Sequence, residues 1–216
     1  MKGILFDFDG TLADTLPLCF YAFHEVFKKN DHKALSNEEI AAMFGPSETD
    51  IITQHLLRQD RVEDAIADFY HFYHQEHERL AQVNPEIMAL LKQLKGAGKS
   101  LGIVTGKARK SLEISMERLG MNGLFDVVIT GDDVQKPKPD PEGVRLAMSR
   151  LNVTKEETVF IGDSNFDIRA GKEAGVVTIG VHWLPTVQSV HFDIPPDYLF
   201  TRTDELLELL GVSAKR

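Results

Sequence analysis

The chain has 216 residues, of which 43% are hydrophobic and 26% are charged, as is typical of a folded globular protein. Its formal net charge of −9 argues against nonspecific nucleic-acid binding, which requires clustered Lys and Arg, and no apolar run reaches the roughly 20 residues that a membrane-spanning helix needs. We therefore expect a protein that binds neither nucleic acid nor membranes. A single cysteine excludes an intramolecular disulfide, and no signal peptide precedes the first predicted strand, so we also expect a cytoplasmic location. The sequence leaves the oligomeric state open.

Two carboxylates end the first apolar run, which reads Gly-Ile-Leu-Phe-Asp-Phe-Asp-Gly-Thr-Leu over residues 3–12. Residues two apart on an extended strand point to the same side, so Asp7 and Asp9 are expected to face one site. Gly10 permits a tight turn, and Thr11 has a hydroxyl that caps a following helix. A turn and a helix cap explain an isolated Asp-x-Asp-Gly equally well, so other segments must decide.

Residues 15–82 carry helical patterns and no convincing strand. Helices are predicted over residues 36–44, 48–58 and 62–82, the first of them opened by a capping-box pattern. The break at Gly45-Pro46-Ser47 predicts either a simple interhelix turn or a loop that dips toward an active site.

Strands and helices alternate after Asn84-Pro85, where a further helix begins. Strands are predicted over residues 101–105, 127–129, 158–161, 176–181 and 198–200, and helices over residues 108–119, 141–151, 167–174 and 204–210. This alternation predicts an α/β fold with a doubly wound parallel sheet covered on both faces, into which the helices of residues 15–82 are inserted after strand one.

Further polar groups follow the later strands, at the edge where doubly wound sheets bind ligands. Strand two leads to Thr105 and Gly106, the segment after strand three contains Lys136 and Lys138, and strand four leads to Asp163 and Asp167. Taken singly, each has a structural explanation: Thr105 and Asp163 as helix caps, the lysines as solvated turn residues.

Together these groups fit phosphoryl transfer. The acids Asp7, Asp9 and Asp163 favour a hard divalent cation such as Mg²⁺. One aspartate then attacks phosphorus while a second moves a proton. Thr105 and Lys136 are expected to bind the phosphoryl oxygens.

The four segments resemble the four motifs of the haloacid dehalogenase superfamily, and the resemblance spans nearly the whole chain. It implies a Rossmann-like core of residues 1–14 and 83–216 with an all-helical cap of the first type, residues 15–82. The subgroup that it resembles most is that of phosphoglycolate phosphatase and related small-molecule phosphatases.

The resemblance also implies roles for individual residues. Asp7 is the nucleophile that forms an aspartyl-phosphate, and Asp9 protonates the leaving oxygen and then activates water. Thr105 with Gly106 binds the phosphoryl group, and Lys136 neutralises its charge, because Lys136 begins a Lys-Pro-x-Pro pattern; Lys138 is treated as its neighbour. Mg²⁺ contacts Asp7, the backbone carbonyl of Asp9 and Asp163, with Asp167 as an outer or occasional ligand.

The function expected from this resemblance is Mg²⁺-dependent hydrolysis of a small phosphorylated metabolite, such as a phosphoglycolate-like phosphomonoester. Alternatives within the superfamily are an inorganic pyrophosphatase and a sugar phosphomutase. The Gly10-Thr11 form of the first motif disfavours the phosphomutase. A non-catalytic receiver-like or partner-binding protein is the alternative of another class. A receiver places its phosphorylated Asp on strand three and has no helical insertion after strand one, so the order of the motifs disfavours it.

Three further features are expected to be structural. Lys107 is predicted to be a solvated lysine at a helix start, since the P-loop pattern around it is incomplete. Cys19 is predicted to be a buried small apolar side chain. His71, His74 and His77 are predicted to lie on a solvated helix face rather than around a metal, since offsets of three drift around a helix.

Overall fold

The computed structural model describes residues 1–212 and contains one parallel sheet of six strands in the order β3-β2-β1-β4-β5-β6. The strands are β1 (Gly3–Phe6), β2 (Ser100–Val104), β3 (Val127–Ile129), β4 (Thr158–Gly162), β5 (Val177–Val181) and β6 (Tyr198–Phe200). Strand β1 lies between β2 and β4, so its carboxyl end is at the centre of the sheet.

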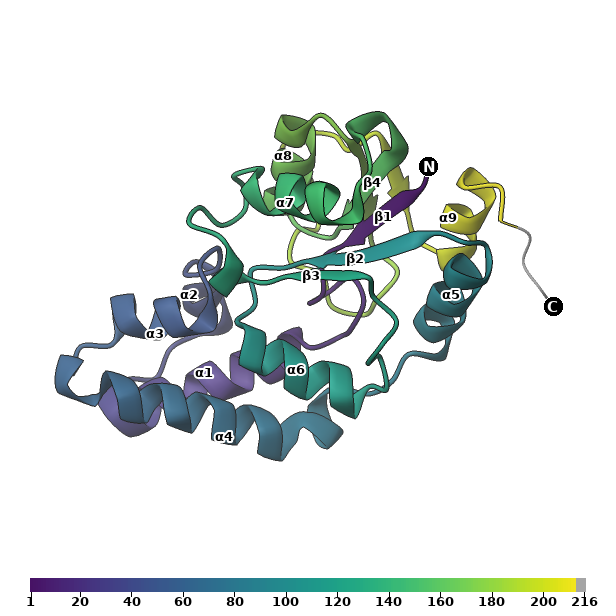
Figure 1. Ribbon diagram of the computed structural model, residues 1–216. Coiled ribbons are helices and arrows are strands. Elements are labelled where there is room, and N and C mark those ends of the chain that lie inside the picture. Colours follow the sequence, from purple (N-terminus) through teal and green to yellow (C-terminus); the bar gives the residue numbers. More distant parts are fainter. Residues whose placement is uncertain (213–216) are drawn as a thin grey trace.

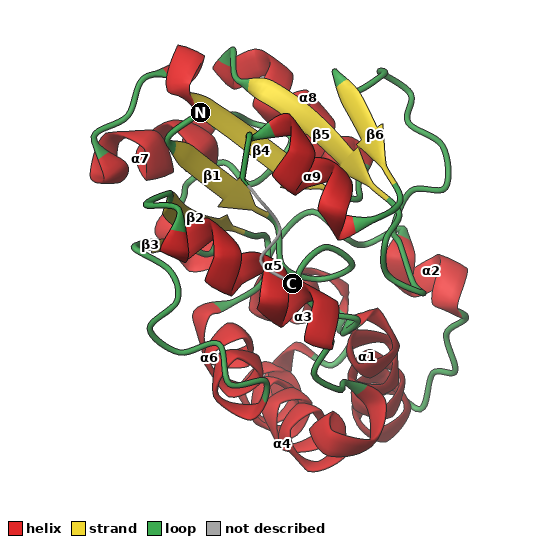
Figure 2. Cartoon of the chain, turned by 90° about the vertical axis from the view of Figure 1, so that its right-hand side faces the viewer, coloured by secondary structure: helices red, strands yellow, loops and turns green. Residues whose placement is uncertain are grey.

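Helices cover both faces of this sheet, as Figure 2 shows. They are α5 (Pro85–Gly96), α6 (Arg109–Arg118), α7 (Glu142–Leu151), α8 (Asn165–Ala174) and α9 (Thr203–Leu209). The side chains of β1 alternate between two cores: Ile4 and Phe6 pack with apolar residues of α5, α6 and α9, whereas Leu5 packs with those of α7 and α8. This arrangement confirms the predicted α/β doubly wound fold.

The helical insertion, residues 15–82, lies beyond the carboxyl ends of the strands (Figure 1). It contains α1 (Leu16–Asp31), α2 (Asn37–Ala41), α3 (Glu48–His55) and α4 (Val62–Leu80). Its buried side chains form a core of their own, in which the ring centroids of Phe23 and Phe69 are 4.8 Å apart. The aromatic residues of α4 that belong to this core, Phe69, Tyr70 and Tyr73, therefore serve packing.

Two helices of the insertion are shorter than the sequence pattern predicts. The capping box at Ser36 is present, but α2 already ends at Ala41. Helix α3 ends at His55, because the carboxylate of Asp31 accepts hydrogen bonds from the backbone N–H groups of Leu57 and Arg58, at 2.8 and 3.1 Å. These bonds hold the chain out of helical conformation after α3.

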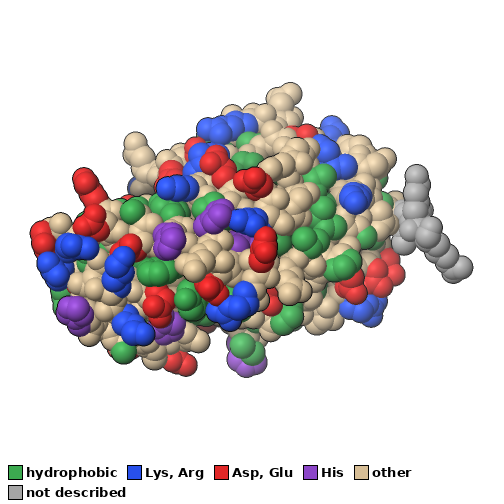
Figure 3. All heavy atoms as spheres, turned by 90° about the horizontal axis from the view of Figure 1, so that it is seen from below, with side chains coloured by type: hydrophobic (Ala, Val, Ile, Leu, Met, Phe, Trp, Pro, Cys, Tyr) green, Lys and Arg blue, Asp and Glu red, His purple; other side chains and the backbone are tan. Residues whose placement is uncertain are grey.

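Acidic and basic side chains are interspersed on the face seen in Figure 3. Many are paired along the helices of the insertion, as in the Lys29–Asp68 ion pair at 2.7 Å and the pairing of Arg79 with Glu76. None of the described helices is both long and apolar enough to cross a membrane.

Candidate active site

The carboxyl end of β1 carries the first two acids of the site. The backbone N–H of Asp7 donates to the carbonyl of Ile161 at 2.8 Å, which continues the sheet ladder by one residue. The fully buried Phe8 separates Asp7 from Asp9, and Gly10 has φ +81°, a left-handed conformation that favours glycine. A Cβ on Gly10 would lie 2.3 Å from Oδ2 of Asp163, so glycine is also required by space.

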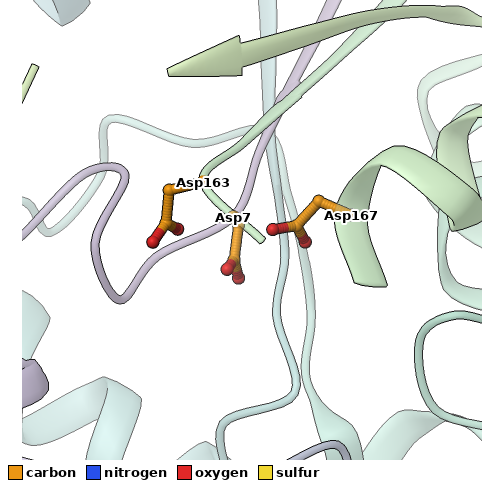
Figure 4. A group of neighbouring side chains, drawn as sticks. All are labelled: Asp7, Asp163 and Asp167. Carbon is orange, nitrogen blue, oxygen red and sulfur yellow. The ribbon is translucent and has the colours of Figure 1, made fainter. Parts of the chain in front are cut away.

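Three buried carboxylates gather at this end of the sheet, with Asp7 between Asp163 and Asp167 (Figure 4). One oxygen of each lies within 4.8 Å of the others. Burial, with the neighbouring charge of Asp167, raises the pKa of Asp7 to about 7, and burial raises the pKa of Asp163 well above its usual range. The charged form of these carboxyls is therefore costly unless a cation compensates it, because water cannot solvate it.

Lys138 is the cation of this cluster. Its Nζ lies 2.8 Å from Oδ1 of Asp7 and 2.6 Å from Oδ1 of Asp167. One ammonium cannot balance three ionised carboxylates, and carboxylate oxygens are the donors that Mg²⁺ prefers. The residues present therefore fit a divalent cation.

The structure brings Lys138 to the carboxylates and does not bring Lys136 there. The side chain of Lys136 is exposed, and its backbone N–H donates to Oε2 of Glu142 at 3.0 Å. The sequence did hold the necessary signal, because Lys-Pro-x-Pro occurs twice, at Lys136 and again at Lys138. The structure selects the second occurrence.

Asp9 lies apart from the three clustered carboxylates. Its Oδ1 accepts a hydrogen bond from the hydroxyl of Thr15 and lies 3.2 Å from Nζ of Lys107. Its backbone carbonyl accepts from Nε2 of Gln188 at 3.4 Å. The two acids of the first motif therefore have different partners, although the strand presents both at one edge.

Strand β2 leads into the loop of Thr105, Gly106 and Lys107. Thr105 is buried, and its hydroxyl accepts from the backbone N–H of Lys107 at 3.2 Å. The prediction that Lys107 is solvated is wrong: its side chain is fully buried and its Nζ lies 2.9 Å from Oε1 of Glu48. Sequence reasoning missed Glu48, since its partners come from a different part of the chain.

These groups line one cavity between the sheet and the helical insertion, with an empty volume of about 570 Å³ that includes its open mouth. The sheet side contributes Asp7, Asp9, Thr105, Gly106, Lys107, Lys138, Ser164, Phe166 and Gln188, and the insertion contributes Leu16, Cys19, Phe23, Phe44, Gly45, Pro46, Glu48 and Ile51. The break after Phe44 thus forms a loop at the cavity, the second of the two predicted possibilities.

The three histidines of α4 do not form a metal site. Among residues 1–212, the group of acids or histidines close enough to hold an ion is Asp7, Asp163 and Asp167. His71 and His74 are exposed as predicted, but His77 is buried and its Nε2 lies 3.0 Å from the hydroxyl of Ser115 on α6. Burial lowers the pKa of His77 to about 4.

Comparison with known proteins agrees with this arrangement. The family described as "Haloacid dehalogenase-like hydrolase" matches residues 4–181. Pyrophosphatase PpaX of Bacillus velezensis is 34% identical over 212 residues, which cover 98% of this chain and 97% of that protein.

Solved structures show the same fold. CbbY from Rhodobacter sphaeroides, in complex with phosphate, is 27% identical with a TM-score of 0.82 and covers 98% of this chain and 99% of its own. A predicted phosphoglycolate phosphatase from Haemophilus somnus is 22% identical with a TM-score of 0.81, over 97% of this chain and 98% of that one, which is a likeness of fold alone.

The protein has a doubly wound α/β fold with buried acids at the carboxyl ends of its strands. The chain belongs to the haloacid dehalogenase-like hydrolase family and is a phosphatase of that superfamily. The expected resemblance is thereby confirmed.

Proposed function

We propose that this protein is a Mg²⁺-dependent phosphatase that hydrolyses a small phosphorylated metabolite through a covalent phosphate on Asp7. The observation that carries the proposal is the position of Asp7, which lies in the cavity between the sheet and the helical insertion, beside Lys138 and two further buried carboxylates. The helical insertion closes this cavity opposite the sheet, and we propose that it acts as a cap over the core of residues 1–14 and 83–216.

In the first step, a carboxylate oxygen of Asp7 attacks phosphorus and the bond from phosphorus to the leaving oxygen breaks. Asp9 donates a proton to that oxygen. In the second step Asp9 takes a proton from water, which attacks the aspartyl-phosphate and releases inorganic phosphate. The two acids suit these separate roles, because Asp7 lies beside Lys138 whereas Asp9 is held by Thr15 and Lys107.

Other residues of the cavity bind the phosphoryl group. We assign charge neutralisation to the ammonium of Lys138 rather than Lys136, and hydrogen bonding to Thr105 and the backbone of Gly106. Asp7, Asp163 and the backbone carbonyl of Asp9 would hold Mg²⁺, with Asp167 beside them. When bound, the ion neutralises charge on the phosphoryl oxygens.

We consider two substrate classes. A phosphoglycolate-like phosphomonoester is the first, because the four sequence motifs resemble those of the phosphoglycolate phosphatase subgroup. Pyrophosphate is the second, because a relative 34% identical along nearly the whole chain is named a pyrophosphatase.

The test measures phosphate release from phosphoglycolate, pyrophosphate, sugar phosphates and nucleotides, with Mg²⁺ and with a chelator. Asp7→Asn is compared with the wild type and with Asp60→Asn, a matched change at an exposed aspartate. We expect release that requires Mg²⁺ and is abolished only by Asp7→Asn, and the best substrate decides between the two classes. Release that survives Asp7→Asn would refute the covalent mechanism.

A further inference from the structure

Glu48, the first residue of α3, reaches from the helical insertion into the core. Its Oε1 accepts hydrogen bonds from Nζ of Lys107 at 2.9 Å and from the hydroxyl of Ser111 at 2.7 Å. Its Oε2 accepts a hydrogen bond from the backbone N–H of Ala108. Glu48 as a whole is 6% exposed, and both carboxylate oxygens are used within the protein.

Glu48 shares the capping of α6 with Asp132, whose Oδ2 accepts a hydrogen bond from the backbone N–H of Arg109 at 2.8 Å. The N-cap residue of α6 is Ala108, which has no side chain that can cap a helix, and the first N–H groups of a helix have no partners within the helix. Glu48 provides a partner from a position 60 residues away in the sequence, and a carboxylate is favoured near a helix N-terminus. This bond exists only while α3 lies against α6.

The same contact leads to Asp9 through Lys107. The ammonium of Lys107 lies between the two carboxylates, 2.9 Å from Oε1 of Glu48 and 3.2 Å from Oδ1 of Asp9, and 4.6 Å from the ring centre of Tyr73. Its side chain is fully buried, so its position is fixed by these partners. Without Glu48, one of the two charges that hold the ammonium would be missing.

We propose that Glu48 is a closing contact of the helical insertion at the active site, and that it is a positioning residue for Asp9. When the insertion is closed, Glu48 binds Lys107 and the start of α6, and Lys107 in turn holds the carboxylate of Asp9 in place. When the insertion moves away to admit substrate or release product, these bonds break together. The inference rests on the proposed function, since it takes Asp9 as the acid–base residue and the insertion as a cap.

Cys19 reports opening without any substrate. It is the only cysteine of the chain, is 5% exposed on α1, and its Sγ lies 3.4 Å from Nζ of Lys107. Burial raises the pKa of this thiol well above its usual value, so the closed protein should react slowly with a disulfide reagent such as dithionitrobenzoate. Opening separates α1 from Lys107 and exposes the thiol.

The main variant is Glu48→Gln, which keeps the size of the side chain and removes its charge. Hydrogen bonds to charged groups are about twice as strong as neutral ones, so we expect Cys19 to react about tenfold faster in this variant. Glu63→Gln is the matched control, because Glu63 is an exposed glutamate in the first turn of α4; its rate should equal the wild type. Circular dichroism checks that each variant is folded.

Should Glu48→Gln fail to fold, Ser111→Ala provides a milder test, since it removes one hydrogen bond to Glu48 and leaves the charges in place. We expect Cys19 to react about threefold faster in Ser111→Ala. The proposal would be overturned if Cys19 reacted no faster than in the wild type in whichever of the two variants is folded.

Steady-state kinetics tests the positioning role. We expect Glu48→Gln and Lys107→Met to lower kcat at least tenfold with a smaller change in KM, and Lys107→Arg, which keeps the charge, to recover part of kcat. An unchanged kcat in Glu48→Gln would refute the positioning role while leaving the proposed function intact. If the wild type released no phosphate from any substrate, the proposed function would fail, but the thiol reaction would still test the closing contact.

Discussion

The two lysines of the segment after β3 offer a direct test of the candidate site, through Lys138→Met and Lys136→Met. Both changes remove one positive charge and keep a side chain of similar length, and the two positions are two residues apart in one loop. Their surroundings differ: Lys138 is 2.8 Å from Asp7 and 2.6 Å from Asp167, whereas the side chain of Lys136 is exposed. Only Lys138→Met should affect the site.

The expected magnitude follows from burial. Removing one partner of a buried ion pair costs about 3–5 kcal/mol, because the remaining charge has no counter-charge. Loss of one group that stabilises the charge of a transition state lowers kcat about 10²–10³-fold. For an exposed lysine, both effects should be small: less than about 0.5 kcal/mol in stability and about threefold or less in kcat.

The assay combines phosphate release at saturating Mg²⁺ with thermal unfolding in the presence of a chelator. Lys138→Met should lose most of its activity, and should unfold at a lower temperature when no metal compensates the charge of Asp7, Asp163 and Asp167. Lys136→Met should match the wild type in both measurements. Equal losses in the two variants, or a larger loss in Lys136→Met, would refute the assignment of Lys138.

Three further changes test other parts of the structure. Gly10→Ala should destabilise the protein much more than Gly98→Ala in urea unfolding. Both glycines have positive φ, which costs other residues about 1–2 kcal/mol. Only at Gly10 would the new Cβ also clash, because it would lie 2.3 Å from Asp163. Mg²⁺ at about 100 times its dissociation constant should stabilise the wild type by about 2.7 kcal/mol, and Asp163→Asn should abolish that shift in thermal unfolding; an equal shift in both would contradict the assigned metal ligands. His77 has a pKa of about 4 in the folded protein against about 6.5 when unfolded, so between these pH values the unfolded chain binds a proton that the folded protein does not. The free energy of unfolding should therefore fall as pH drops from 6.5 toward 4, by at most about 1.4 kcal/mol per pH unit. Denaturant unfolding at several pH values should show a shallower decline in His77→Gln, and parallel curves would mean that His77 does not contribute.

Local patterns in the sequence determined the sheet and its functional edge. Every predicted strand appears within a residue or two of its predicted position, because the alternation of apolar runs with helices is a property of neighbouring residues. Two local features were enough to predict that acids meet at one edge of the sheet. Asp7 and Asp9 are two residues apart, and Asp163 directly follows β4. Parallel strands bring their carboxyl ends together whatever the remaining details.

The tertiary structure decided which cations face those acids and from where. Lys136 and Lys138 share one sequence pattern, and only the course of the loop past β1 shows that the second reaches Asp7. The sequence predicted a solvated Lys107 at a helix start, but the structure buries it beside Glu48 of the helical insertion. His77 likewise differs from His71 and His74 because α4 turns it toward Ser115 of α6. Charge pairing in a protein interior depends on distances between segments far apart in the chain, which local patterns do not encode.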